Sequence, residues 1–115
     1  MNIGVAYENG RIAGNLGDCR TFLIVSAEDG NPTGKRLAAV EGGNTTDLIK
    51  MVSMEKVDAL ICGALGLALR NALEMIGVLL VPGCEGAAEE AVAKFLVGEK
   101  QGDPTLLEIG REEDP

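Results

Sequence analysis

Two short segments combine a cysteine with closely spaced glycines, and they carry the clearest chemical signal in the sequence. They are Ile61–Gly66 and Val81–Gly86, and each follows a short apolar run and precedes a predicted helix. In an open α/β sheet, ligands bind outside the carboxyl ends of the strands, where such turns lie. The sequence therefore predicts a ligand site at these two strand ends, with the thiols of Cys62 and Cys84 beside it.

The glycines of these segments suggest how an anion would be held. The first turn of a helix presents unpaired backbone N–H groups and a partial positive charge. Because glycine has no side chain, a ligand can approach the backbone closely at Gly63, Gly66 and Gly83. Glycines are equally common in tight strand-to-helix turns that bind nothing. Both interpretations, an anion site and a simple turn, stay open at the level of sequence.

The three cysteines point to a soft metal. Cys62 and Cys84 end two strands that should be parallel, and Cys19 follows a glycine-rich loop that the first strand enters. All three thiols are then expected at the same edge of the sheet, where the parallel strands end. Converging thiolates suit an iron–sulfur cluster, Cu(I) or Zn. A free cysteine is also often just a small buried apolar residue, and this alternative is strongest for Cys62.

Other residue types argue against catalysis. The chain has no histidine, which removes Cys–His and Ser–His nucleophile pairs and imidazole metal ligands. A nuclease that holds two metal ions needs acidic residues on its central strands. The first predicted strand has none, and Asp58 stands alone in the fourth. We therefore expect a non-enzymatic protein.

Composition limits the class of partner. The chain has 18 acidic and 10 basic residues, and the resulting net charge of −8 opposes binding to nucleic acid. No apolar run reaches the roughly 18–20 residues that cross a bilayer, so we expect no membrane partner. The sequence does not open on a signal-like segment, which predicts a cytoplasmic protein.

The elements that must position these residues follow the order β-β-β-α-β-α-β-α. A turn cluster at Glu28–Gly34 makes the second and third strands an antiparallel hairpin, whereas two crossover units make the later strands parallel. This predicts an α/β protein, a mixed five-stranded sheet with helices covering its faces. The predicted strands are Met1–Tyr7, Thr21–Ala27, Lys35–Val40, Val57–Cys62 and Val78–Val81. One predicted helix follows a cap at Asn44, Thr45 or Thr46, and the others span Leu65–Ile76 and Glu85–Leu96.

Three stretches of the sequence carry a resemblance to a known family. They are Asn15–Phe22, Asp58–Gly66, and Gly77–Gly86 with the alanine-rich helix behind it. Together they resemble the dinitrogenase iron–molybdenum cofactor biosynthesis domain, of the NifX and NifB C-terminal type, over residues 1–97. The resemblance implies a three-layer α/β/α fold with ribonuclease-H-like topology. It also implies a small carrier or chaperone of metal–sulfur clusters.

The resemblance further implies a cofactor site at the strand ends and in the loop before the second strand. Two positions of that loop depart from the family pattern, since Asn15 stands in place of a histidine and Asp18 in place of a basic residue. Both changes weaken the binding of an anionic cluster. The implied cofactor-binding residues are Asn15, Gly17, Cys19, Cys62, Gly63, Gly66, Gly83 and Cys84, with Cys19, Cys62 and Cys84 as the metal ligands.

Two functional hypotheses follow. The first is a carrier of an iron–sulfur or iron–molybdenum cluster, or of a precursor, that hands its cargo to a protein partner. The second is a module that binds a small anionic ligand or a protein partner and has lost metal binding. In either case residues 1–97 would form the binding domain and residues 98–115 a charged, flexible tail. The sequence does not predict the oligomeric state.

Overall fold

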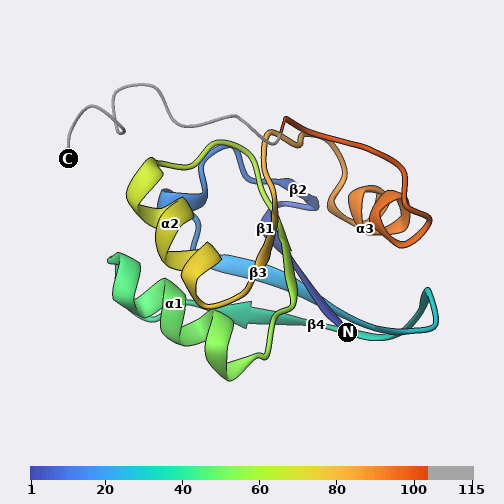
Figure 1. Ribbon diagram of the computed structural model, residues 1–115, viewed down its shortest axis with the longest axis horizontal. Helices are drawn as coiled ribbons and strands as arrows, with labels where there is room; N and C mark the ends of the chain where they lie inside the picture. The colour runs from blue at the N-terminus through green and yellow to red at the C-terminus, as the bar shows by residue number, and fades with distance from the viewer. Residues whose placement is uncertain (104–115) are drawn as a thin grey trace.

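The strands and helices follow one another in nearly the expected order (Figure 1). The computed structural model describes residues 1–103, and no helix in this range is long and apolar enough to cross a membrane. Two short elements, β2 and the 3-10 helix η1, lie in a segment expected to be a loop. In chain order the elements are β1 (Asn2–Glu8), β2 (Arg11–Ile12), η1 (Leu16–Asp18), β3 (Thr21–Glu28), β4 (Asn31–Ala39), α1 (Thr45–Met54), β5 (Ala59–Ile61), α2 (Leu67–Met75), β6 (Leu79–Val81) and α3 (Ala88–Leu96).

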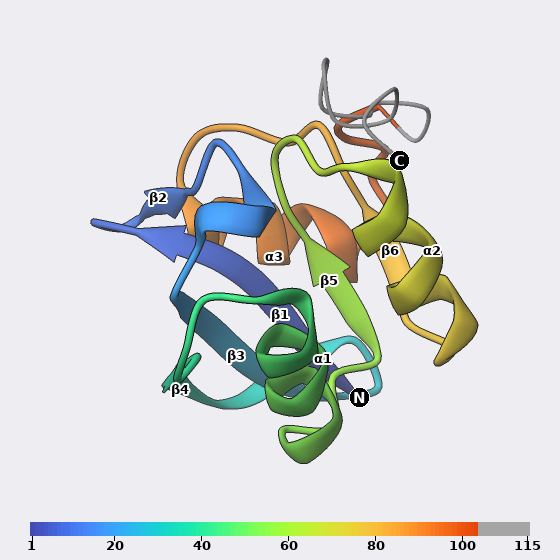
Figure 2. The same ribbon diagram turned by 90° about the vertical axis from the view of Figure 1, so that its left-hand side faces the viewer.

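The strands form one mixed sheet in the order β4-β3-β1-β5-β6, with β2 paired to β1 beside this path. β1 pairs antiparallel with β3 and parallel with β5, and β5 pairs parallel with β6. The helices α1 and α2 cover one face of the sheet and α3 covers the other, as Figure 1 and Figure 2 show from two sides. The expected three-layer α/β/α fold with a mixed sheet is therefore confirmed.

Each face of the sheet carries its own hydrophobic core, the α1/α2 core and the α3 core. Successive side chains of a strand point to opposite faces. Ile3 and Val5 of β1 accordingly pack in the α3 core, whereas Ala6 packs in the α1/α2 core. β3 divides in the same way, with Ile24 in the α1/α2 core and Val25 in the α3 core. A shift of one residue along a strand therefore moves a side chain from one core to the other.

The hairpin between β3 and β4 is tighter than the sequence predicts. Its turn consists of Asp29 and Gly30, whose φ angles are 52° and 80°. A two-residue turn with two positive φ angles matches the twist of the flanking strands, so β4 begins at Asn31 and not at Lys35. Pro32 is tolerated there because β4 lies at the edge of the sheet.

The second and third helices begin later than expected. α2 starts at Leu67 and not at Leu65, and α3 starts at Ala88 and not at Glu85. Before α3, Gly83 and Gly86 adopt φ angles of 75° and 101°, a left-handed conformation that glycine adopts easily. The glycine-marked segments are therefore connections between strand and helix, and only Gly66 lies directly at a helix start.

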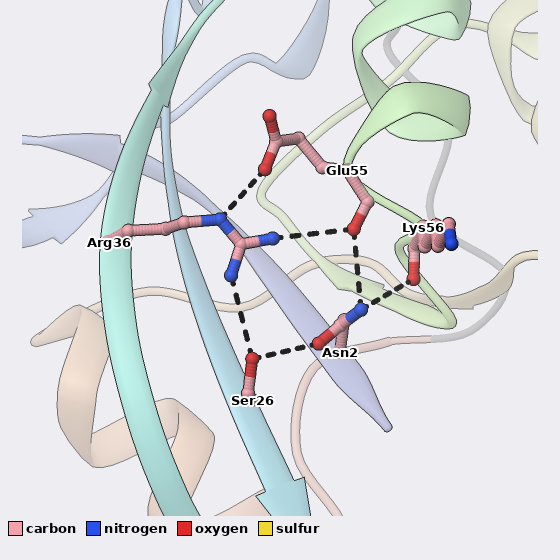
Figure 3. Close-up of polar contacts among 5 residues, drawn as sticks. All are labelled: Asn2, Ser26, Arg36, Glu55 and Lys56. Atoms are coloured by element: carbon pink, nitrogen blue, oxygen red, sulfur yellow. Dashed lines mark hydrogen bonds and ion pairs between the residues drawn. The ribbon is translucent and has the colours of Figure 1, made fainter.

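A polar network around Asn2, at the start of β1, holds the last turn of α1 (Figure 3). Arg36 of β4 contacts the carboxylate of Glu55 at 2.8 Å, and the Nδ2 of Asn2 donates to the carbonyl oxygens of Glu55 and Lys56 at 3.3 and 3.1 Å. The hydroxyl of Ser26 donates to the Oδ1 of Asn2 at 2.9 Å. The network joins β1, β3 and β4 to the end of α1.

The segment after α3 returns to the end of β6. Gln101 donates from its side chain to the carbonyl oxygen of Ala91 at 2.8 Å, and the amide of Asp103 donates to the carbonyl oxygen of Pro82 at 2.8 Å. Of the predicted flexible tail, residues 98–115, the part beyond Asp103 lies outside the described residues. The predicted domain boundary at residue 97 stays a prediction.

Candidate functional site

Three loops meet at the carboxyl ends of β1, β5 and β6. The amide of Ala64 donates to the carbonyl oxygen of Gly14 at 2.9 Å, and the amide of Leu16 donates back to Ala64 at 2.9 Å. On the other side, the amide of Gly83 donates to the carbonyl oxygen of Gly63 at 2.9 Å. The two glycine-marked strand ends therefore lie side by side, and the loop that contains Asn15 forms a third wall beside them.

The glycines at this junction serve the packing of the loops. A Cβ atom on Gly63 would lie 2.6 Å from the carbonyl oxygen of Gly14, so only glycine fits at this position. The amide of Gly17 is engaged by the Oδ1 of Asn15 at 2.9 Å, and the amide of Gly83 by Gly63. These amides are already paired inside the protein. For Gly63 and Gly83, the tight-turn interpretation explains the glycine.

The three cysteines are divided between the two cores. Cys19 and Cys62 belong to the α1/α2 core, and Cys84 belongs to the α3 core. Their exposed fractions are 5%, 0% and 7%. Within residues 1–103, no three His, Cys, Asp or Glu side chains are grouped closely enough to hold one metal ion. The structure thus does not assemble Cys19, Cys62 and Cys84 into the expected ligand set, because the segments that follow β5 and β6 turn Cys62 and Cys84 into different cores.

Each thiol lies in surroundings that keep it protonated. The Sγ of Cys19 donates to the carbonyl oxygen of Thr21 at 3.0 Å, and the Sγ of Cys84 lies 3.5 Å from the carbonyl oxygen of Val81. Burial raises the pKa of Cys19 and Cys84 above the ordinary value. Burial, together with the two neighbouring thiols, raises the pKa of Cys62 to about 12.

A pocket of about 440 Å³ opens between the first turns of α1 and α2. One wall is the loop with η1, which contributes Gly17 and Arg20, and the opposite walls are the two helix starts at Asn44 and Gly66. We call it the helix-start pocket. Its full lining is Gly17, Asp18, Arg20, Val40, Gly43, Asn44, Thr45, Leu48, Gly66, Leu67, Ala68 and Leu69.

The helix-start pocket has positive elements on three sides. The guanidinium of Arg20 donates to the carbonyl oxygens of Gly17 and Cys19 at 3.3 and 3.2 Å, and these bonds hold it against the loop that contains η1. Both helix starts add the partial positive charge of their unpaired amides. The side chain of Asn44 caps α1 by accepting from the amide of Asp47, whereas Gly66 has no side chain with which to cap α2. The arrangement suits an anion at the α2 start.

A second, more open groove of about 670 Å³ lies on the other side of the same loop. Tyr7, Asn15, Cys19 and Thr21 are among the residues that line it, and it shares Asp18 and Arg20 with the helix-start pocket. Of the predicted site residues, Gly17 and Gly66 line the helix-start pocket, and Asn15 and Cys19 line the groove. Four others line neither cavity: Cys62, Gly63, Gly83 and Cys84.

The sequence reasoning missed two walls of the helix-start pocket. Arg20 lies inside the segment that carries the family resemblance, and Asn44 was expected as a helix cap. Neither residue was expected at a ligand site, because the pocket forms only where the start of α1 comes next to η1 in the folded chain. An arginine one residue after Cys19, in a loop already predicted to form a wall, was the signal that could have found it.

Several solved structures share this fold at low sequence identity. The protein PH0822 matches with a TM-score of 0.83 at 17% identity, over 91% of this chain and 96% of that one. The apo form of the orange protein from Desulfovibrio gigas matches with a TM-score of 0.76 at 19% identity, over 90% of this chain and 92% of that one. A candidate dinitrogenase from Methanocaldococcus jannaschii matches with a TM-score of 0.72 at 19% identity, over 90% of this chain and 95% of that one. At these identities the likeness shows a shared fold.

Family membership comes from the sequence itself. No relative was found among curated proteins. A family model described as dinitrogenase iron-molybdenum cofactor matches residues 1–98, a range that includes every strand and helix described above. The resemblance carried by Asn15–Phe22, Asp58–Gly66 and Gly77–Gly86 is thereby confirmed. The chain belongs to the dinitrogenase iron-molybdenum cofactor family.

Proposed function

We propose that this protein is a non-enzymatic carrier that binds an iron–sulfur or iron–molybdenum cluster, or a precursor of one, and passes it on. The observation that carries the proposal is the family match over residues 1–98, because the family is described by that cofactor. The matched range contains all the residues that line the helix-start pocket and the neighbouring groove.

The helix-start pocket supports an anionic cargo. Metal–sulfur clusters that carry sulfide ligands are anions, and anions are stabilised at helix N-termini and by guanidinium groups. Arg20 and the uncapped start of α2 at Gly66 offer both kinds of group to one volume of about 440 Å³. The bound cluster would lie between them.

The lining of the pocket favours carriage over catalysis. Its ionisable residues are Asp18 and Arg20, and the chain has no histidine. Arginine stays protonated in proteins and does not act as a base. A single carboxylate beside an arginine offers little for general acid–base catalysis, which needs a group that exchanges protons near the working pH. Binding and release are what this pocket can do.

A second candidate function is the binding of a small anionic metabolite without metal. The observation that favours it is the position of Asp18, which lines both cavities. Its negative carboxylate reduces the attraction of both cavities for a multiply charged cluster. A thermal-shift screen of carboxylate and phosphate metabolites tests this candidate. A metabolite that raises the melting temperature while a thiometallate does not would favour it over the carrier.

The carrier proposal is tested with tetrathiomolybdate, a small molybdenum–sulfur dianion, by equilibrium dialysis without oxygen. Arg20→Gln removes the guanidinium from the pocket. Lys50→Gln is the matched control, since Lys50 is also exposed and lies on α1 outside this pocket. A charge-assisted hydrogen bond is worth about 1.5–3 kcal/mol, so Arg20→Gln should weaken binding about tenfold or more.

The control should bind as tightly as the wild type. Equal binding by wild type and both variants would place the cargo elsewhere on the chain. If wild-type protein binds neither tetrathiomolybdate nor a cluster formed from iron and sulfide, the carrier proposal is wrong.

A further inference from the structure

We propose that residues 99–103 form a releasable strap that controls access to the thiol of Cys84. In the closed position the strap covers this thiol at the edge of the α3 core. When the strap lifts, the thiol meets solvent while the sheet and the helices stay folded. The strap begins just beyond the family match, which ends at residue 98, and none of its residues lines the helix-start pocket.

The strap bridges the two elements that flank Cys84 in the chain. After α3 the chain reverses and runs back to the end of β6 (Figure 1). The Nε2 of Gln101 donates to the carbonyl oxygen of Ala91, in α3, at 2.8 Å. The amide of Asp103 donates to the carbonyl oxygen of Pro82, directly after β6, at 2.8 Å. The strap therefore closes over the connection that contains Cys84.

Gly102 lies directly against the sulfur of Cys84. A Cβ atom on Gly102 would lie 2.8 Å from the Sγ of Cys84 and would overlap the carbonyl oxygen of Pro82. Gly102 also has a φ of 72°, a left-handed conformation that glycine adopts easily. With the strap closed, the exposed fraction of Cys84 is 7%. Only glycine can bring the strap this close to the thiol.

The strap is attached to the domain by weak contacts. Its sequence, Glu99–Asp103, contains no apolar side chain that could be buried in the α3 core. The ion pair between Glu99 and Lys94 spans 4.0 Å with both side chains exposed, and such pairs contribute little to stability. Among the described residues, the hydrogen bonds of Gln101 and Asp103 are the main attachments beyond the first residue of the strap. A segment with so little buried surface opens locally far more often than the whole domain unfolds.

The other two thiols are internal controls for the position of the strap. Cys62 has an exposed fraction of 0% and belongs to the α1/α2 core, on the opposite face of the sheet from α3. Cys19 belongs to the same core, and its Sγ donates to the carbonyl oxygen of Thr21 at 3.0 Å. Lifting the strap leaves the surroundings of both thiols unchanged. The reactivity of Cys84 relative to Cys19 and Cys62 therefore reports on the strap.

Labelling of the intact chain with N-ethylmaleimide at pH 8 tests the strap, with mass spectrometry of each cysteine peptide as the readout. The thiolate sulfur adds to the double bond of the maleimide, and the neighbouring carbon takes a proton from water. In wild type we expect Cys84 to react at a rate that barely changes in dilute urea, because lifting the strap exposes little surface. Cys62 should instead react only through global unfolding, so its rate should rise steeply with urea.

Gly102→Ala prevents the strap from closing, because the added Cβ atom overlaps the carbonyl oxygen of Pro82. The hydrogen bonds of Gln101 and Asp103 are then lost together, so Cys84 should react about tenfold faster or more. Gln101→Ala removes one of these bonds and should accelerate Cys84 by about two- to tenfold. Lys100→Gln is the matched control in the same strap, since Lys100 is exposed. This control should leave the rate at Cys84 within about twofold of wild type.

An unchanged rate at Cys84 in Gly102→Ala would show that the strap does not cover the thiol. Equal acceleration at all three cysteines would mean that Gly102 supports the whole fold and not a separate strap, which also contradicts the proposal. A second measurement needs wild type alone: a rate at Cys84 that rises with urea as steeply as the rate at Cys62 would show that no local opening exists.

Discussion

Gly63 shows how closely the loops of the site approach one another. A Cβ atom there would lie 2.6 Å from the carbonyl oxygen of Gly14 and 2.8 Å from that of Ala13, both backbone atoms that cannot rotate away. The Gly63→Ala variant should therefore lose about 1–3 kcal/mol of unfolding free energy, the usual cost of overpacking. Urea denaturation followed by circular dichroism measures this loss.

Gly14→Ala is the matched control on the facing loop. No atom lies within 4 Å of a Cβ built on Gly14, so this variant should be at least as stable as wild type. Equal stability of the two variants would mean that the loops are farther apart than the structure shows.

The raised pKa of Cys62 predicts how stability depends on pH. The thiol ionises near 9.0 in the unfolded chain and, because of burial, near about 12 in the folded protein. Between these values the folded state keeps a proton that the unfolded state has lost, so stability falls as pH rises above 9.0. The slope due to this group is at most about 1.4 kcal/mol per pH unit.

Other groups also titrate in this range, so the test compares two proteins. Cys62→Ala lowers stability by a pH-independent amount and removes this part of the slope. The difference in unfolding free energy between wild type and Cys62→Ala, measured from pH 8 to pH 11, should therefore shrink as pH rises. A difference that stays constant would show that the Cys62 thiol is not shielded from water.

The sequence could predict which residues come together at the carboxyl ends of β1, β5 and β6, but not where their side chains point. The adjacency of the loops at Gly63 and Gly83 follows from strand order and is confirmed. The separation of Cys84 from Cys62 depends on the turn after β6, where Gly83 has a φ of 75°, and strand order does not specify that turn. Arg20 was missed because its position depends on the η1 turn, which the sequence does not mark.

At the scale of elements, the two ends of α1 have different surroundings. Its first turn at Asn44 lines the helix-start pocket, and its last turn is bonded to the sheet through Asn2 and Arg36 (Figure 3). Lys56, which follows the helix, has a φ of 55°, an uncommon conformation for a side-chain-bearing residue. The bond from Asn2 to its carbonyl oxygen helps to hold this turn.

Asn2→Ala removes three side-chain hydrogen bonds, to Glu55, Lys56 and Ser26. We expect a loss of about 1–3 kcal/mol in unfolding free energy, because carbonyl groups at the helix end lose their donor. Asn31→Ala is the control, since Asn31 makes a single exposed bond at 3.4 Å to Asp29. Chemical denaturation should leave the control within about 0.5 kcal/mol of wild type. A comparable loss in both variants would contradict the anchoring role.

Most element types were predictable, and their boundaries were not. Hydrophobic patterns identify β1, β3, β5, β6 and the three helices of the described region, which the structure confirms. The start of β4 was misplaced because Asn31–Gly34 reads as a turn, whereas the turn needs only Asp29 and Gly30. β2 has two residues, too few for a pattern, and it forms because it pairs with β1.

At the scale of the whole molecule, net charge opposes the anionic cargo proposed for the helix-start pocket. The chain carries a net charge of −8, and its radius of gyration is 12.9 Å. At 0.01 M salt the Debye length is about 30 Å, so an approaching anion senses the whole protein, whereas at 0.15 M it is about 8 Å. At the higher salt the anion senses mainly the groups near Arg20.

This contrast predicts that the association rate constant of tetrathiomolybdate rises between about 0.01 M and 0.15 M salt. For an anion that binds a basic protein, the association rate constant instead falls as salt is added. Stopped-flow absorption measures the rate directly. A rate that falls steeply with salt would mean that local attraction at the pocket exceeds the repulsion of the net charge.

The overall architecture was the most predictable level. Strand order follows from the two crossover units and the hairpin, since crossovers require parallel neighbours and hairpins antiparallel ones. The structure confirms both relations in β5–β6 and β3–β4. The helix-start pocket was not predictable from this order, because it arises where α1, α2 and η1 come together in space.

The central claim is that a metal–sulfur anion, the proposed cargo, binds between Arg20 and the starts of α1 and α2. The most direct test is a crystal structure of the protein grown with tetrathiomolybdate without oxygen, with data collected at the molybdenum absorption edge. The account predicts one anomalous peak in the helix-start pocket, within hydrogen-bonding reach of the Arg20 guanidinium through its sulfide ligands. A peak bonded to the sulfur of Cys19 or Cys84, or no peak in the pocket at saturating concentration, would contradict it.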